Sequence, residues 1–242
     1  MPAHVPRFLK TILVAFLLLL AAVAGLWKLS EARSFQAFGK LVHRVETAQP
    51  LVALTFDDGP TPAGAQAILA LLEQEGVRAT FFFTGAEMAA QPGLAARFVQ
   101  AGHELGNHSY THTRMVLKSP AFVRDELDRT DALIRQAGQA GPILFRPPYG
   151  RKLLVLPWVL ARSGRTSVTW DVEPESFPEV DGNAQRITAH VLERAKPGSI
   201  ILLHVMYPSR AESLHAVQGT IRGLKARGLR LVTVSELLRA GG

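Results

Sequence analysis

Short runs of β-favouring residues alternate with amphipathic stretches along most of this chain. The β-favouring runs lie at residues 51–56, 79–83, 103–107, 143–146, 166–170, 199–204 and 230–232. Between them, apolar residues recur at helical spacing, as in Ala65, Ile68, Leu69 and Leu72. Because strands that alternate with helices form right-handed βαβ units, this order predicts an α/β fold with a parallel sheet.

The predicted strands are continuous apolar runs, such as IILLH at residues 200–204. Such runs suit a sheet that is covered on both faces. No Gly-x-Gly-x-x-Gly loop follows the first run, so we expect a closed or nearly closed barrel, with an open doubly wound sheet as the alternative.

Ser119 followed by Pro120 predicts the start of a helix, because a capping side chain precedes proline at the first helical position.

An uncharged apolar segment covers residues 11–27, TILVAFLLLLAAVAGLW, and basic residues precede it. It has no polar face, so it is predicted to be a membrane element and not a core helix. Its length lies between that of a membrane-spanning helix and that of the apolar part of a signal peptide. Trp27 followed by Lys28 favours a retained anchor, whereas the pattern Ala22-Val23-Ala24 would permit cleavage.

These features divide the chain into three parts. Residues 1–29 are expected to be a signal anchor, residues 30–49 a juxtamembrane helix or stalk, and residues 50–242 the folded domain. We expect the N-terminus inside the cell and the domain on the extracytoplasmic face of the cytoplasmic membrane. If the segment is cleaved, the domain would instead be periplasmic or secreted.

The composition excludes several kinds of site. The chain has no cysteine, which rules out disulfides, thiolate ligands and a cysteine nucleophile, so any metal must bind His, Asp or Glu. The formal charge of +7 comes mostly from arginines scattered through predicted helices, and there is no basic run with interleaved aromatic residues. A nucleic acid is therefore not expected as a partner.

Polar residues stand where the predicted strands end. They are Asp57 and Asp58, His108, Arg146, Asp171 and His204. Because the C-terminal ends of parallel strands meet on one face of an α/β barrel, we expect these side chains to converge on one site. The two adjacent aspartates require a cation or an arginine to offset their charge, although Asp-Gly-Pro is also a good turn sequence.

The sequence HSYTH places His108 and His112 four residues apart. On a helical turn this spacing directs both imidazoles to the same side, where they can share a metal ion. An aspartate that joins them makes a set of two nitrogen ligands and one oxygen ligand with open positions, as in catalytic metal sites. The alternative for either histidine is a structural role in the core or at the surface.

Arg146 and His204 are candidates for roles beside such a metal. Arg146 ends a strand, is followed by two prolines, and can neutralise and orient a carboxylate. His204 ends a strongly apolar strand and is suited to general acid or base catalysis if Glu173 or Asp171 stabilises its charged form. A buried structural histidine is the alternative.

These segments, in this order, resemble the motifs of the polysaccharide deacetylases, carbohydrate esterase family 4, which share the NodB-homology domain. The matching motifs are TFDDGP, HSYTH, RPPYG and the Leu-x-His sequence that ends at His204. The resemblance extends from about Pro50 to the C-terminus and implies a distorted parallel (β/α) barrel of about seven strands. It also implies a zinc-like divalent metal, with Co²⁺, Ni²⁺ or Mn²⁺ as other candidates, bound by Asp58, His108 and His112.

The same resemblance implies a role for each residue around the metal. Asp57 would be the general base, oriented by Arg146, and the backbone N–H of Tyr149 would face the oxyanion. His204 would be the general acid, supported by Glu173 in place of the family's usual aspartate. The residues expected to contact the substrate or the oxyanion are Tyr149, Pro148, Trp170, Asp171, Phe177 and Leu202, with Phe177 replacing a tryptophan of the family's groove wall.

The expected reaction is metal-dependent hydrolysis of the N-acetyl group of an N-acetylglucosamine-containing glycan. That glycan could be peptidoglycan, an exported hexosamine polymer or a chitin-like oligomer. One alternative is an O-acetyl esterase that acts on xylan. Another is a catalytically silent glycan-binding envelope protein, although such proteins typically lack a metal ligand or the base, and neither is missing from this sequence.

Overall fold

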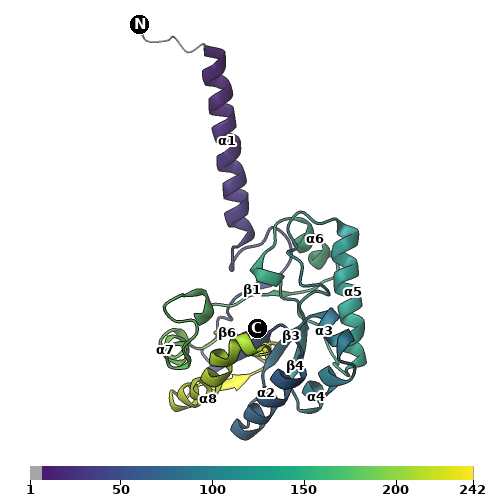
Figure 1. Cartoon of the computed structure of the whole chain (residues 1–242), viewed down its shortest axis with the longest axis vertical. Helices are drawn as coiled ribbons and strands as arrows, with labels where there is room; N and C mark the ends of the chain where they lie inside the picture. Colours follow the sequence, from purple (N-terminus) through teal and green to yellow (C-terminus); the bar gives the residue numbers. More distant parts are fainter. Residues whose placement is uncertain (1–6, 242) are drawn as a thin grey trace.

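The central strand of the domain is β2 (Leu51–Asp57), in which every residue is buried. In the computed structural model, β2 pairs with β3 (Thr80–Phe83), β6 (Ile200–His204) and β7 (Arg230–Val232). β4 (Glu104–Asn107) pairs with β3 and completes a five-stranded sheet (Figure 1). All of these pairings are parallel, which confirms the predicted α/β fold.

Two short strands lie beside this sheet. β1 (Leu41–Val42) pairs in parallel with β5 (Ser167–Val168). Phe145 forms single bridges to β4 and to β5, and Val172 forms one to β6. The regular pairing therefore makes two parallel sheets, which isolated bridges connect.

The predicted strand at residues 143–146 is wrong in extent, because only Phe145 bridges to neighbouring strands. Pro142 and Pro147 flank this run and have no backbone N–H to donate, which restricts a regular ladder. β1 has no counterpart among the predicted strands, since two residues are too few to show a period.

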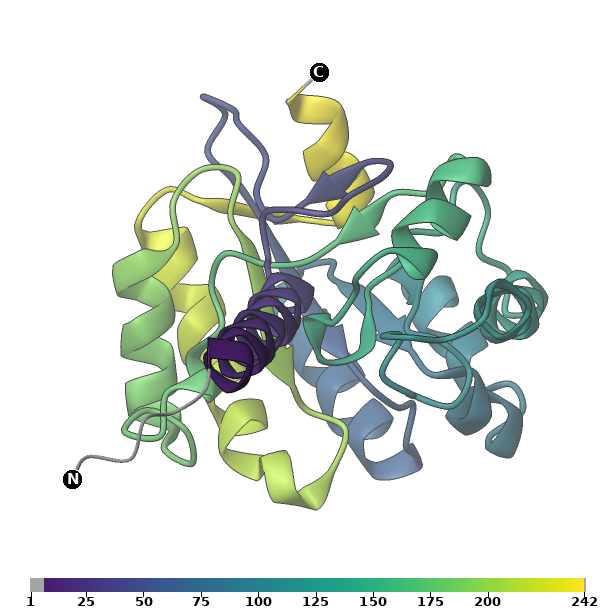
Figure 2. The same ribbon diagram turned by 90° about the horizontal axis from the view of Figure 1, so that it is seen from above.

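Helices surround the sheet (Figures 1 and 2). They are α2 (Pro62–Glu75), α3 (Gly85–Ala90), α4 (Leu94–Gln100), α5 (Pro120–Gln136), α6 (Val155–Arg162), α7 (Ala184–Arg194), α8 (Ala211–Ala226) and α9 (Val234–Ala240), with 3₁₀ helices η1 (Pro148–Gly150), η2 (Pro174–Ser176) and η3 (Pro208–Arg210). α2 buries Ala65, Ile68 and Leu72, as their spacing predicts. α5 begins where predicted, and the side chain of Ser119 accepts a hydrogen bond from Phe122 N.

Side chains on both faces of β2 are buried in apolar clusters. Leu54 and Phe56 belong to a cluster that also contains Ile68 of α2. Ala53 belongs to a second cluster, with Leu202 of β6. A sheet covered on both faces explains why the strand sequences are continuously apolar, and it leaves polar side chains at the strand ends.

The structure describes residues 7–241, and α1 (Arg7–Ser30) stands out from the domain as a single helix (Figure 1). Its apolar side chains are exposed, and it is long and apolar enough to cross a membrane. At 1.5 Å per residue the helix is about 36 Å long, compared with ~30 Å for the hydrocarbon core of a bilayer. Residues 1–6 of the expected anchor and residue 242 of the expected domain lie outside the described residues.

Residues 31–49 pack against the domain and do not form the helix or stalk predicted for residues 30–49. Lys40 O accepts a hydrogen bond from Ser167 N at 2.9 Å, and Val45 N donates one to Gly198 O at 2.9 Å. The weak patterning of this segment reflects short stretches that pair with distant parts of the chain. None of these stretches is long enough to show a period of its own.

Candidate active site

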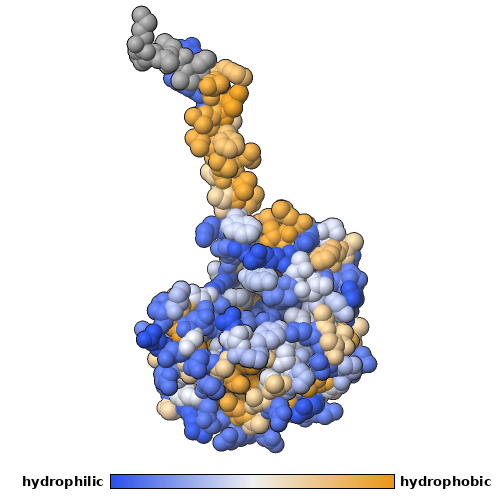
Figure 3. All heavy atoms as spheres, in the orientation of Figure 1, coloured by the Kyte–Doolittle hydropathy of each residue, from blue (hydrophilic) through white to orange (hydrophobic). Residues whose placement is uncertain are grey.

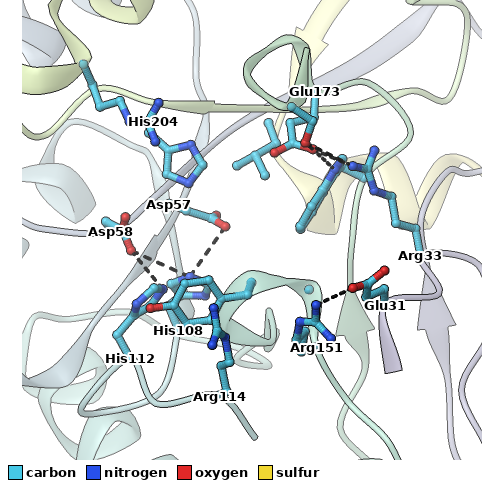
Figure 4. Close-up of a pocket in the computed structure, with 16 residues that line it drawn as sticks. Glu31, Arg33, Asp57, Asp58, His108, His112, Arg114, Arg151, Glu173 and His204 are labelled. Atoms are coloured by element: carbon cyan, nitrogen blue, oxygen red, sulfur yellow. Dashed lines mark hydrogen bonds and ion pairs between the residues drawn. The ribbon is translucent and has the colours of Figure 1, made fainter. Parts of the chain in front are cut away.

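A pocket of about 480 Å³ opens where the C-terminal ends of β2, β4 and β6 meet. The residues predicted from the sequence that line it are Asp57, Asp58, His108, His112, Tyr149, Trp170, Glu173, Leu202 and His204 (Figure 4). Arg146 is fully buried and contacts Asp57. The structure thus brings together the polar residues of several strand ends in one site.

Asp58, His108 and His112 form a compact group of three ligand atoms, all within 4.8 Å of one another. Asp58 Oδ1 lies 3.3 Å from His112 Nε2 and 3.8 Å from His108 Nε2. Two imidazole nitrogens and one carboxylate oxygen suit Zn²⁺ and leave positions for water and substrate. The donor set therefore fits a catalytic divalent metal.

The two histidines reach these positions on a loop and not on the predicted helical turn. Ser109 and His112 have φ angles of 67° and 56°, which a right-handed helix does not allow. The buried carboxylate of Glu126, from α5, accepts hydrogen bonds from Tyr110 N at 3.0 Å and Thr111 N at 2.8 Å. A distant helix thus fixes the loop, whose positive φ angles are of the strained kind found at functional sites.

His108 is held in the form that a metal ligand requires. Its Nδ1 donates a hydrogen bond to Arg146 O at 2.8 Å, which leaves the Nε2 lone pair free. Burial, followed by the charge of His112, lowers the pKa of His108 to about 3. The imidazole is therefore neutral at physiological pH and able to bind a cation.

Arg146 holds Asp57 in a buried ion pair. Arg146 Nη1 donates to Asp57 Oδ1 at 2.6 Å, and its Nε and Nη2 donate to the carbonyls of Val168 and Thr169. Asp57 Oδ2 lies 3.6 Å from His108 Nε2. Arg146 thus orients a carboxylate through its guanidinium and a histidine through its backbone carbonyl.

His204 is paired with Glu175. One oxygen of Glu175 accepts a hydrogen bond from His204 Nδ1, and the other accepts one from His204 N at 3.0 Å. Burial alone would lower the pKa of His204, but the hydrogen bond and the charge of Glu175 outweigh burial and raise this pKa to about 9. His204 is therefore protonated at neutral pH, as a general acid must be.

Comparison with known proteins agrees with this geometry. Residues 44–168 match the family model for polysaccharide deacetylase. The chain is 38% identical over 200 residues to a chitooligosaccharide deacetylase of Bradyrhizobium sp. (strain ANU 289), which covers 77% of this chain and 90% of that protein. The chain belongs to the polysaccharide deacetylase family.

Two further comparisons, one with a protein sequence and one with a solved structure, agree with this family. This polysaccharide deacetylase is 33% identical to the peptidoglycan-N-acetylglucosamine deacetylase PgdA of Listeria monocytogenes, over 77% of this chain but 38% of that protein. A crystal structure of a peptidoglycan N-acetylglucosamine deacetylase superimposes with a TM-score of 0.76 at 31% identity, over 82% of this chain and 92% of that chain. The family resemblance expected from the motifs is confirmed, and the protein is a hydrolase with an α/β fold of the barrel type.

Glu173 does not support His204, although the family resemblance implied that it would. It lies on another wall of the pocket, where Glu173 Oε2 accepts hydrogen bonds from Arg33 Nη2 at 2.6 Å and Trp170 Nε1 at 3.0 Å (Figure 4). η2 begins between Glu173 and Glu175 and turns their side chains in different directions. The supporting carboxylate of this deacetylase is therefore Glu175.

Asp171 is not a substrate residue in this structure. Its carboxylate accepts hydrogen bonds from Ser199 Oγ and Ile200 N, both at 2.8 Å. These partners lie at the start of β6, whereas His204 lies at its end. β5 ends at Val168, earlier than predicted, so Asp171 does not stand at a strand end on the catalytic face.

Phe177 and Pro148 also lie outside the pocket lining, in contrast to Trp170 and Leu202. The ring of Phe177 packs against that of His190 with centroids 4.6 Å apart, because the chain leaves the pocket after η2. Pro148 is buried in η1. The replacement of the family's tryptophan by Phe177 therefore does not shape this pocket directly.

Several carboxylates that support the site were not among the predicted residues. Glu175 and Glu126 are two of them, and Glu87 is a third, since it accepts hydrogen bonds from Gly59 N at 2.8 Å and from Tyr207 OH at 2.5 Å. The sequence could have indicated Glu126, because it stands on the buried face of α5, where a charge without a partner would be costly. Glu175 and Glu87 have no such signal.

Proposed function

We propose that this protein is a metal-dependent deacetylase that hydrolyses the N-acetyl group of an N-acetylglucosamine-containing glycan and releases acetate. The observation that carries the proposal is the convergence of Asp58, His108 and His112 beside Asp57 and His204 in one pocket. Relatives named as chitooligosaccharide and peptidoglycan deacetylases support the same reaction and substrate class.

Asp58, His108 and His112 would hold the divalent cation. Zn²⁺ suits two imidazoles and one carboxylate best, and Co²⁺, Ni²⁺ or Mn²⁺ are the alternatives. When bound, such a cation makes water easier to deprotonate and an acetyl carbonyl easier to attack.

Asp57 and His204 would move the protons. Asp57, which Arg146 fixes through one oxygen, accepts a proton from the attacking water. His204, charged below about pH 9, donates a proton to the departing amine nitrogen. We assign to the backbone N–H of Tyr149 the stabilisation of the carbonyl oxygen as it becomes negative. Trp170 and Leu202 would provide apolar surface for the sugar ring.

We also infer that α1 anchors the protein in the cytoplasmic membrane, with the catalytic domain on the extracytoplasmic face. The length and hydropathy of α1 support a span, and Trp27 with Lys28 suits the interface. In this organisation the anchor ends near residue 29, and the catalytic domain begins at Ser30. Cleavage after Ala24 would instead give a periplasmic or secreted enzyme.

We further infer that the isolated bridges between the two sheets complete a distorted barrel of about seven strands.

Removal of the metal is expected to abolish acetate release reversibly. A chelator should inactivate the full-length protein, and added Zn²⁺ should restore activity. His112→Ala removes one of three ligands and should weaken metal binding by at least ~100-fold, whereas His215→Ala changes an exposed histidine outside the pocket and should not. Bound metal and acetate release are measured for each variant, and full metal content with normal activity in His112→Ala would reject the ligand set.

The acetyl linkage is tested with N-acetylated chito-oligosaccharides and O-acetylated xylo-oligosaccharides. We expect kcat/KM to be at least ~10-fold higher for the N-acetyl substrates, because the protonated His204 is suited to an amine leaving group that cannot depart unprotonated. Acetate from the O-acetyl substrates alone would indicate an esterase. Acetate from neither, with metal bound, would indicate a silent glycan-binding protein.

A further inference from the structure

The domain end of α1 is fixed to the edge of the catalytic pocket. Ser30, the last residue of α1, is buried; its carbonyl accepts a hydrogen bond from Lys152 N at 2.9 Å, and its Oγ accepts one from Arg151 Nη1 at 3.1 Å. The Arg151 guanidinium also lies 4.0 Å from the ring centroid of Trp27. Arg151 follows Tyr149 of the pocket by two residues. The helix and the pocket wall are therefore joined without a flexible linker.

The chain that leaves α1 forms part of the pocket wall. Glu31 and Arg33 both line the pocket (Figure 4). Arg33 forms an ion pair with Glu173 at 2.6 Å, and its guanidinium lies 5.1 Å from the ring centroid of Trp170. Arg33 O accepts a hydrogen bond from Thr169 Oγ1 at 2.6 Å. Both the backbone and the side chain of Arg33 are thus held in place at the site.

These contacts determine how far the pocket lies from the bilayer. Trp27 ends the apolar run, and Arg33 follows it by six residues, of which the first three are helical. Along the chain, Arg33 therefore lies within roughly 15 Å of Trp27. Figure 2 shows α1 end-on over the middle of the domain. The pocket thus lies at the membrane end of the domain, close to the lipid headgroups.

The same end of the domain presents apolar surface beside α1. Figure 1 places α6 at the end of the domain nearest α1. Figure 3 shows apolar atoms on the domain surface beside the base of α1. Leu154, which precedes α6, is 55% exposed, and Trp158 of α6 is 38% exposed. The guanidinium of Arg162 lies 5.5 Å from the Trp158 ring. Exposed apolar and basic side chains together suit contact with a bilayer surface, which would hold the domain against the membrane.

We propose that this deacetylase takes its N-acetylated glycan from a lipid carrier in the same membrane. The inference rests on the proposed deacetylase function and on α1 as the anchor. A domain on a flexible stalk could reach a glycan polymer far from the bilayer, whereas a pocket whose wall at Arg33 is fixed within roughly 15 Å of Trp27 faces saccharides that are attached to the bilayer surface. Attachment to a lipid also confines enzyme and substrate to one surface, which raises their effective concentration.

The experiment compares two forms of the full-length protein in vesicles of phosphatidylethanolamine and phosphatidylglycerol. One form is the wild type, and the other carries a Gly/Ser insertion of about 30 residues between Lys28 and Leu29, with a reach of roughly 30 Å. Ser30 stays on the domain side of the insertion with its partners Arg151 and Lys152, and so does Arg33 with Glu173, whereas the contacts of Trp27 with Ser30 and Arg151 are broken. The substrates are N-acetylated chitotriose free in solution and the same trisaccharide coupled to a lipid in the vesicles. Acetate release gives kcat/KM for each pair.

We expect the wild type to prefer the lipid-coupled trisaccharide by roughly 100-fold, and the insertion to reduce this preference at least ~10-fold while activity on the free trisaccharide stays within about twofold. An equal preference in both forms, or none in the wild type, overturns the inference and leaves the deacetylase function intact. Acetate from neither substrate overturns the proposed function, and the inference with it.

A matched pair of variants tests the pocket wall separately. Arg33→Gln removes the ion pair with Glu173, whereas Arg44→Gln removes the 2.6 Å ion pair with Glu46, which lies in the same segment but outside the pocket. Arg33→Gln should raise KM for both trisaccharides roughly 10-fold with little change in kcat, and Arg44→Gln should change neither. An unchanged KM in Arg33→Gln would show that Arg33 takes no part in substrate binding.

Discussion

Asp57→Asn is expected to lower kcat for acetate release by roughly 10³-fold with metal binding retained, because a positioned general base typically contributes 10²–10⁴-fold. Asp57 Oδ1 accepts a hydrogen bond from Arg146 at 2.6 Å, while Oδ2 lies 3.6 Å from His108 Nε2. Asparagine keeps the shape of the side chain and can still accept a hydrogen bond from Arg146. Its amide cannot accept a proton from water near neutral pH. The rate of acetate release and the bound metal are measured on the same preparation.

Asp171→Asn is the matched control for this substitution. Asp171 is half-buried, and its partners are Ser199 and Ile200, away from the pocket. This variant should keep kcat within about twofold of the wild type.

The free energy of unfolding should fall by roughly 3 kcal/mol in Asp57→Asn, because the charge of Arg146 loses its buried partner. A folded, metal-loaded Asp57→Asn protein with near-normal kcat would remove Asp57 from the role of base.

The sequence is sufficient to predict the part of the site that strand order determines. Asp57, His108 and His204 each stand at the end of an apolar strand or just beyond it, and parallel strands present their C-terminal ends on one face. Their convergence therefore follows from topology alone. Asp58 and His112 lie a few residues further along the chain, so they arrive at the same place although the predicted helical turn is a loop.

The rest of the site depends on short irregular segments, which have no periodicity to read. η2 decides that Glu175 and not Glu173 reaches His204. Arg33 enters the pocket because β1, a strand of two residues, pairs with β5 more than a hundred residues away. Contacts of this kind are set by long-range packing, and residue spacing carries no information about them.

Glu175→Gln is expected to move the alkaline limb of the pH profile of kcat to lower pH. In the wild type this limb should lie near pH 9, because His204 is active in its protonated form and its pKa is raised to about 9. Without the charge of Glu175, only the charges of Asp57 and Asp58 remain to oppose the effect of burial, so this pKa falls. The limb should shift by at least ~1 pH unit, so the loss of kcat should be small near pH 6 and reach about 5-fold or more near pH 9.

Glu173→Gln makes the same change of charge two residues away, but Glu173 lines the pocket and its partners are Arg33 and Trp170, so this variant should raise KM and leave the alkaline limb in place. Stability gives a second readout. Because the folded-state pKa of His204 is raised above its ordinary value of 6.5, the pair with Glu175 stabilises the fold fully below about pH 6.5, and this contribution is lost as the pH rises through about 9. The decline in the free energy of unfolding over that interval should be smaller in Glu175→Gln. A limb that moves in Glu173→Gln, or stays fixed in Glu175→Gln, would mean that Glu175 does not control the protonation of His204.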